Sequence, residues 1–309
     1  MGEGAVEESR PGGEVRRGWA GGGRGAEPRV LSLRLRGFAV HSLPMKYTYT
    51  ELAQMIDHSL LHPTLTDQEL EAGCRLAAKY GVASVCIKPY AVQRAVELLQ
   101  GSGVRVGCVI GFPHGNSGTE SKRYETELAC RDGAVEIDMV INIGKALSGD
   151  WAYVARDIQA VGDEAHRHGA KVKVIFENDY LANGGAGLSS DDFKRKLCQI
   201  AERAGADWVK TSTGYGFVKQ KDGNYNYRGA TEPDLKLMRA ACSSRVQVKA
   251  AGGVRDLDGL ILVRDLGGTR CGATATAVML DEYRRREAEE KRGGGPDAHG
   301  EEALGRAGH

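Results

Sequence analysis

The 309-residue chain has an ordinary globular composition, with 41% hydrophobic and 27% charged residues and a formal net charge of +1. This balance provides no global field that would attract nucleic acid or an anionic membrane, and the longest apolar runs are far shorter than the roughly 20 residues of a membrane span. The seven cysteines are scattered and form no CxxC motif, which indicates reduced thiols in the cytoplasm.

Residues 1–44 are rich in Gly, Arg and Glu and have almost no apolar periodicity. They contain no apolar core of a secretory signal, and their glutamates argue against a transit peptide. We expect a disordered leader rather than an RNA-binding segment. Met45, directly before the first patterned segment, is a candidate ancestral start. The folded domain is predicted over 45–286 and a disordered tail over 287–309.

Between residues 50 and 285, short β-branched runs alternate with amphipathic stretches of 10–18 residues. The first long helix has clear boundaries, because Thr66 and Glu69 form a capping box and Gly81 follows its last turn. The predicted strands cover 55–60, 83–89, 104–112, 135–143, 170–177, 206–212, 245–252 and 269–275.

Eight strand–helix units over about 230 residues predict a single-domain (β/α)8 TIM barrel. An open, doubly wound sheet is the competing α/β fold, but the GxGxxG turn that often follows its first strand is missing. In a barrel the active site lies at the C-terminal ends of the strands. Polar residues at those ends are therefore the candidate site.

The last two predicted strands end in small residues. KAAGGVRD places Gly252, Gly253 and Arg255 before a helix that begins near Asp256, and CGATAT places Gly272 and Thr274 in the same situation. Backbone N–H groups at such turns, with a helix N-terminus behind them, bind anions. A single GG pair would indicate only a tight turn, whereas two such turns on consecutive final strands favour a phosphate site.

Two lysines lie near the ends of the sixth and seventh predicted strands, Lys210 in ADWVKTSTGYG and Lys249 in VQVKAAGG. Burial and a neighbouring cation both lower the pKa of an amine, and a neutral amine can condense with a carbonyl to form an iminium. Asp138, within EIDMVINI, is the candidate proton carrier, and a structural ion pair with either lysine is the competing interpretation. The eight histidines form no HExxH motif, so we expect no metal and no cofactor.

The motifs IDHSLLHP, VCIKP, IGFPHG, EIDMVINIG, KVIFE, WVKTSTG, VKAAGGVR and GATA together resemble deoxyribose-phosphate aldolase over residues 47–285. The resemblance implies a class I, Schiff-base aldolase that reversibly cleaves 2-deoxy-D-ribose 5-phosphate to D-glyceraldehyde 3-phosphate and acetaldehyde. It makes Lys210 the Schiff-base lysine, Lys249 the residue that tunes its pKa and helps move protons, and Asp138 the proton relay. It also implies substrate contacts from Asp57, at the end of the first strand, and a phosphate grip from Gly214, Gly252, Gly253, Arg255, Gly272 and Thr274.

The chain departs from this family pattern at four places. Tyr215 follows STG where some relatives have lysine, and Thr274 stands where some have serine. The loop 216–233 is longer and more polar than the short form, which suggests a lid or a subunit contact. The C-terminal tail lacks the tyrosine that some relatives use in proton transfer.

The family usually forms pairs, so a homodimer with small phosphosugar and aldehyde substrates is expected, without nucleic-acid or membrane partners. Two other functions fit parts of the pattern. A phosphosugar isomerase or epimerase would use the same phosphate grip with acid–base residues and no covalent intermediate. A non-catalytic sugar-phosphate binding protein would bind without turnover.

Overall fold

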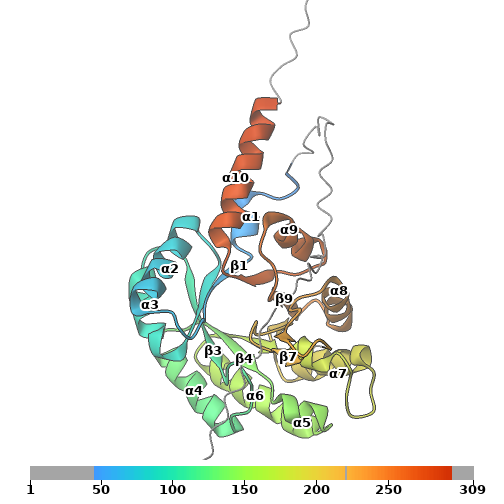
Figure 1. Ribbon diagram of the computed structural model, residues 1–309. Coiled ribbons are helices and arrows are strands. Elements are labelled where there is room, and N and C mark those ends of the chain that lie inside the picture. Colours follow the sequence, from blue (N-terminus) through green and yellow to red (C-terminus); the bar gives the residue numbers. More distant parts are fainter. Residues whose placement is uncertain (1–44, 220, 294–309) are drawn as a thin grey trace, which may run out of the picture. The chain divides into compact units, whose positions relative to one another are not determined.

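A computed structural model describes residues 45–219 and 221–293. The leader predicted for 1–44 lies outside these residues. Eight parallel strands form a closed barrel in the order β1-β10-β9-β6-β5-β4-β3-β2, which confirms the predicted (β/α)8 fold (Figure 1). The strands are β1 (Ile56–Leu60), β2 (Ser84–Ile87), β3 (Arg105–Ile110), β4 (Glu136–Val140), β5 (Lys171–Ile175), β6 (Trp208–Lys210), β9 (Gln247–Ala251) and β10 (Arg270–Ala273).

Helices connect successive strands, and the caps read from the sequence are present. Thr66 and Glu69 form a reciprocal capping box at the start of α2, and Gly81 ends that helix in the left-handed conformation at φ 63°. Ser189 and Asp256 cap α7 and α9 through their side chains. The helices are α1 (Tyr49–Ala53), α2 (Asp67–Tyr80), α3 (Val92–Leu99), α4 (Thr119–Arg131), α5 (Ile143–Leu147), α6 (Trp151–Arg167), α7 (Ser190–Arg203), α8 (Glu232–Ala241), α9 (Leu257–Asp265) and α10 (Thr276–Gly293).

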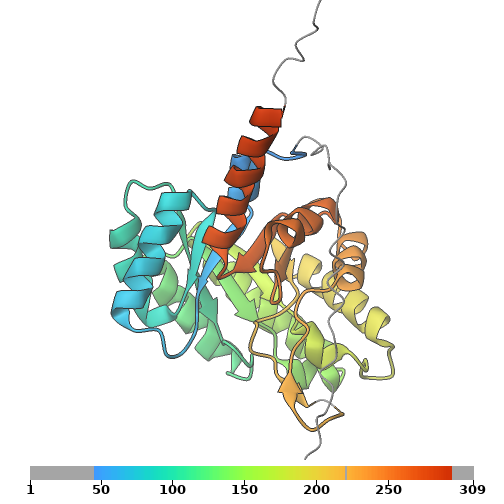
Figure 2. The same cartoon turned by 45° about the horizontal axis from the view of Figure 1, so that its top comes forward.

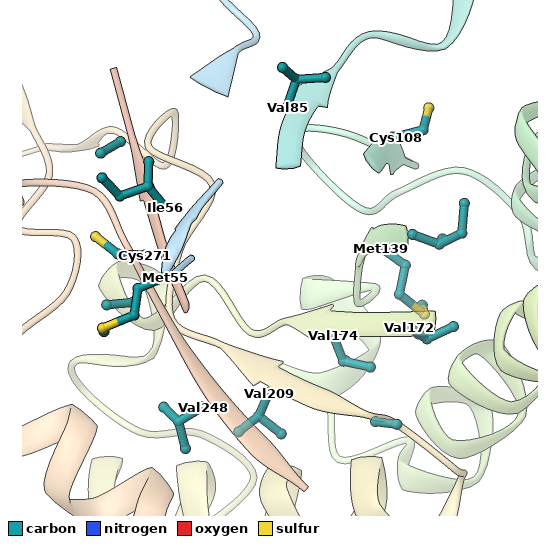
Figure 3. Close-up of a cluster of buried hydrophobic side chains, with 14 of the residues drawn as sticks. Met55, Ile56, Val85, Cys108, Met139, Val172, Val174, Val209, Val248 and Cys271 are labelled. Carbon is teal, nitrogen blue, oxygen red and sulfur yellow. The ribbon is translucent and has the colours of Figure 1, made fainter. Parts of the chain in front are cut away.

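Alternation along the strands separates an apolar layer from a charged interior. Val172 and Val174 of β5 are buried in the hydrophobic core, while Lys173 between them is buried against carboxylates. Successive strand residues point to opposite faces, so the apolar side chains face the helices and the polar ones face the barrel axis. Figure 3 shows Val172 and Val174 with Val209 and Val248 on adjacent strands. This apolar layer holds the barrel closed around the charged interior.

Two features depart from the regular barrel. The long loop after β6 contains a small antiparallel hairpin, β7 (Val218–Lys219) paired with β8 (Tyr225–Asn226). Figure 2 shows this hairpin away from α10, at the other end of the barrel. The last helix, α10, continues to Gly293 and so runs past residue 286, where the folded domain was predicted to end. The Arg285–Glu289 and Lys291–Glu287 pairs, four residues apart, support the extra turns.

Within the two described ranges, 45–219 and 221–293, no helix has both the length and the apolar character needed to cross a bilayer.

Candidate active site

The centre of the site is a carboxylate shared by two lysines. Lys210 ends β6 and pairs in register with Lys249 of β9. The Nζ atoms of both lysines donate to Oδ2 of Asp138 at 2.7 Å. The two nitrogens are therefore separated by at most twice that distance, within the range in which one cation lowers the pKa of another amine. The structure thus brings together the three residues that sequence analysis nominated for the chemistry.

The two lysines differ in the charge that their surroundings favour. Burial lowers the pKa of Lys210, Asp138 opposes this, and the Lys249 cation lowers the pKa further, so that the balance lies below its ordinary value. Burial acts on Lys249 in the same direction. Asp138 and Asp57 outweigh it, however, and raise the pKa of Lys249 well above the ordinary value. Lys249 Nζ also lies 2.6 Å from Asp57 Oδ2, whereas the ion pair of Lys210 in the described residues is with Asp138 alone. Lys210 is consequently the amine that loses its proton more easily.

A charge balance across the barrel interior explains this difference. Lys173, Lys249 and Arg270 provide three buried cations, which face the three buried carboxylates of Asp57, Glu136 and Asp138. If Lys210 is neutral, the charges of these six groups sum to zero. Protonation of Lys210 would add an uncompensated charge to a buried site, which is costly. Arg105 also approaches Glu136, at 3.3 Å, but its side chain is exposed to solvent.

Asp138 is held as a carboxylate from three directions. Burial by itself would raise its pKa, but Lys173, Lys210 and Lys249 outweigh burial and hold the pKa well below the usual range. Its Oδ1 lies 3.1 Å from Lys173 Nζ, close enough for an ion pair although the geometry is not that of a hydrogen bond. The structural ion pairs that competed with a catalytic interpretation are therefore real, and they coexist with the lysine pairing that catalysis requires.

A cavity of about 190 Å³ opens above the two lysines at the C-terminal ends of the strands. Both Lys210 and Lys249 line it, which places the amines at the wall of a space that a small molecule can enter. All six residues predicted for the phosphate grip also line this cavity: Gly214, Gly252, Gly253, Arg255, Gly272 and Thr274. Gly252 and Gly253 have φ near +84°, a conformation that other residues rarely adopt, so glycine is required at this turn.

Asp57 lies deeper in the barrel than its predicted position at the end of the first strand. It is the second residue of β1, not the last, and it does not line the cavity. Its carboxylate accepts from Ser84 Oγ at 2.7 Å and forms ion pairs with Lys173, Lys249 and Arg270. The contact of Asp57 with substrate hydroxyls therefore stays a prediction, and the position of Asp57 below the cavity lining does not support it. Asp57 instead belongs to the charged interior beneath the cavity, where it fixes the Lys249 ammonium.

Comparison with known proteins agrees with this geometry. Residues 51–265 match the family described as DeoC/LacD family aldolase. The chain belongs to this family. It is 49% identical over 239 residues to the deoxyribose-phosphate aldolase of Rhodopirellula baltica, covering 77% of this chain and 92% of the relative. It is 45% identical over 230 residues to deoxyribose-phosphate aldolase 1 of Bacillus licheniformis, covering 74% and 95%.

Among solved structures, the chain is similar to the tetrameric deoxyribose phosphate aldolase of Aeropyrum pernix. The TM-score is 0.66 at 28% sequence identity, and the match covers 77% of this chain and 92% of that one. The family match and the closed barrel together confirm that this chain is an aldolase built on a TIM barrel.

Several residues of this aldolase site were assigned no role from the sequence. Lys173, Glu136 and Arg270 complete the buried charge balance, and only the strand register shows that they meet. The sequence feature that could have revealed them is a charged residue at an inward-facing position of an apolar strand. Cys86 lines the cavity with its Sγ 3.8 Å from Asp138 Oδ2, and burial raises its pKa to about 11, which keeps it a neutral thiol. In the described ranges, no group of three potential metal-ligating side chains gathers in one place.

Glu177 holds the turn that carries the cavity-lining residues after Lys210. It follows β5 with φ 58°, a left-handed conformation that is unusual for glutamate. Its carboxylate accepts from the Thr213 backbone N–H at 3.2 Å and from the Thr213 hydroxyl. Burial raises the pKa of Glu177 to about 7, against the effect of these hydrogen bonds. The same carboxylate packs where a Cβ on Gly216 would lie, so residue 216 must be small.

Glu177 is expected to make stability depend on pH. Its folded-state pKa of about 7 lies above the ordinary 4.5, so its stabilising contribution is complete below pH 4.5 and is lost as the pH rises through 7. The loss is on the order of 3 kcal/mol of unfolding free energy. Glu177→Gln should remove this dependence, measured by denaturant unfolding at pH 5 and pH 8. Glu97→Gln, at an exposed position of α3, is the control. Parallel pH curves for wild type and Glu177→Gln would contradict the assignment.

Proposed function

We propose that this protein is a class I aldolase that reversibly cleaves 2-deoxy-D-ribose 5-phosphate to D-glyceraldehyde 3-phosphate and acetaldehyde. The observation that carries the proposal is the contact of Lys210 and Lys249 with one oxygen of Asp138, with the pKa lowered only for Lys210. The names of the curated relatives support the choice of substrate. The Gly252–Gly253 turn and Arg255, which line the same cavity as the two lysines, suit its phosphate.

In this mechanism the neutral Lys210 Nζ attacks the aldehyde carbon of the open-chain sugar, and loss of water leaves an iminium. The iminium withdraws electrons as the bond between the second and third carbons breaks. The third carbon becomes the aldehyde of glyceraldehyde 3-phosphate, and the first two remain on Lys210 as an enamine. Protonation of the enamine and addition of water release acetaldehyde and return the free amine.

Asp138 and Lys249 are proposed to move the protons of these steps. Asp138 Oδ2 accepts hydrogen bonds from both amines, so it links the reacting nitrogen to a permanent ammonium. Its low pKa means that it holds a proton only in transit, whereas Lys249 carries one stably. Lys249 also keeps Lys210 neutral, which makes it both the tuning residue and a proton source.

Trapping the covalent intermediate is the test of this function. Sodium borohydride added during turnover of 2-deoxyribose 5-phosphate should reduce the imine, inactivate the enzyme and add the mass of a two-carbon or sugar phosphate adduct at Lys210. The competing isomerase or epimerase chemistry predicts no adduct, and the aldolase family does not support it. An unchanged mass at Lys210, with turnover proceeding, would refute the Schiff base.

We also propose that the protein acts in the cytoplasm as a homodimer. The scattered and mostly buried thiols support a reducing compartment, and the tetrameric structure of the A. pernix relative supports self-association. Sedimentation of the purified chain would give its subunit number.

A further inference from the structure

The cavity contains an aromatic side chain that the mechanism above does not use. Tyr227 lines the cavity beside Gly252 and Gly253, although it comes from the segment that follows the β7–β8 hairpin. A Cβ placed on Gly252 would lie 3.2 Å from Cε2 of the Tyr227 ring. The ring therefore packs directly on the glycine turn at the proposed phosphate end of the site.

The backbone around Tyr227 is docked against the same turn. The Ala230 N–H donates to the Gly252 carbonyl at 3.0 Å. Gly229 has φ +72°, and a Cβ there would lie 2.5 Å from the Gly252 oxygen, so the two glycines allow the backbones to touch. This contact fixes the distance between the hairpin segment and the phosphate turn.

A second anchor, from Asp179, holds the same segment. The Asp179 carboxylate accepts from the Arg228 N–H at 2.6 Å and from the Gly229 N–H at 3.0 Å. The Phe217 ring packs edge-on against Tyr227 with centroids 5.4 Å apart. Charge-assisted hydrogen bonds to two consecutive backbone groups define the path of the chain, so the position of Tyr227 is set by the fold.

We propose that Tyr227 is a specificity-determining residue that confines the substrate phosphate against the Gly252–Gly253 turn. This inference rests on the proposed function, because the proposed substrate carries the phosphate that the Tyr227 ring would confine. Backbone N–H groups and Arg255 bind an anion more strongly where a ring excludes water. A sugar without phosphate has no group at the Gly252–Gly253 turn, so the Tyr227 ring does not strengthen its binding. Tyr227 thus increases the preference for the phosphorylated over the unphosphorylated sugar.

Steady-state kinetics of the full chain on 2-deoxyribose 5-phosphate and on 2-deoxyribose test this proposal. Tyr227→Ala is expected to raise the KM for the phosphorylated sugar about tenfold, with kcat within about twofold, and to leave kcat/KM for 2-deoxyribose unchanged. Tyr227→Phe keeps the ring and should show a smaller rise in KM. Tyr225→Ala is the matched control, because Tyr225 is 65% exposed and lies outside the cavity lining.

Asp179→Ala supplies a second variant that acts through the anchor without touching the cavity. It should reproduce the rise in KM for the phosphorylated sugar while kcat is retained. Wild-type kinetics in Tyr227→Ala, or an equal loss on both sugars, would overturn the inference while leaving the aldolase function intact. Absence of wild-type turnover on 2-deoxyribose 5-phosphate would instead overturn the proposed function, and this inference with it.

Discussion

Replacing Lys210 with leucine is expected to abolish turnover while the barrel stays folded. Without the amine no iminium can form, so kcat/KM should fall by at least about 10⁴-fold, as when an enzyme loses its covalent nucleophile. The fold should survive because the removed group is the one that the interior favours as neutral. Asp138 keeps Lys249 at 2.7 Å and Lys173 at 3.1 Å, so it remains paired.

The measurement for Lys210→Leu combines the cleavage assay, borohydride trapping and denaturant unfolding. The unfolding free energy is expected to fall by only about 1–3 kcal/mol, the cost of one lost hydrogen bond to a buried charge. Residual activity within about tenfold of wild type would show that another amine carries the chemistry. Collapse of the fold would show that Lys210 is a structural cation.

The second large effect is expected from Lys249→Leu, which acts on the pKa of Lys210. The substitution leaves two buried cations, Lys173 and Arg270, facing three carboxylates, so protonation of Lys210 would restore the balance. The pKa of Lys210 should therefore rise. At neutral pH, the neutral fraction of an amine with an ordinary lysine pKa is below about 10⁻³. Because only the neutral amine reacts, kcat/KM should fall by about 10²–10³-fold. Activity should recover in part as the pH is raised.

Lys249→Leu also breaks buried ion pairs, so its control must do the same elsewhere. Lys194 of α7 is buried and lies 2.6 Å from Asp234 of α8, away from the cavity. Lys194→Leu should lower stability by about 3–5 kcal/mol, typical of breaking a buried pair, without moving the pH dependence of kcat/KM. A Lys249→Leu enzyme with wild-type activity and pH profile would contradict the proposed tuning.

Local patterns in the sequence were sufficient to predict the barrel and to single out the residues proposed for the chemistry. Period-two apolar runs, the capping box at Thr66 and the Gly81 stop are local features, and the structure reproduces them. Lys210, Lys249 and Asp138 stood out because a charge inside an apolar strand is costly unless it is paired or reactive. The meeting of Lys210 and Lys249 followed from the fold, since strands six and seven of a barrel are neighbours, whereas Asp138 on β4 is separated from Lys210 by β5 and reaches both lysines through the barrel interior.

The parts of the site that could not be predicted from the sequence depend on how strands far apart in the chain are paired in the barrel. The ion pairs of Asp57 with Lys173 and of Arg270 with Glu136 join strands far apart in the chain, and no local pattern encodes them. Asp57 was placed at a strand end because strand boundaries cannot be read to the residue. The loop 216–233 has no periodicity, so the entry of Tyr227 into the cavity was visible only in three dimensions.

Titration of Lys210 itself measures its charge most directly. Protein labelled with ¹³C at the lysine ε-carbons would be followed by NMR across the pH range, and the Lys210 signal would be assigned by its loss in Lys210→Leu. Lys210 is expected to titrate below the ordinary value of 10.5, while Lys249 stays protonated above it. A Lys210 signal that titrates at or above 10.5 would contradict the neutral nucleophile on which the mechanism depends.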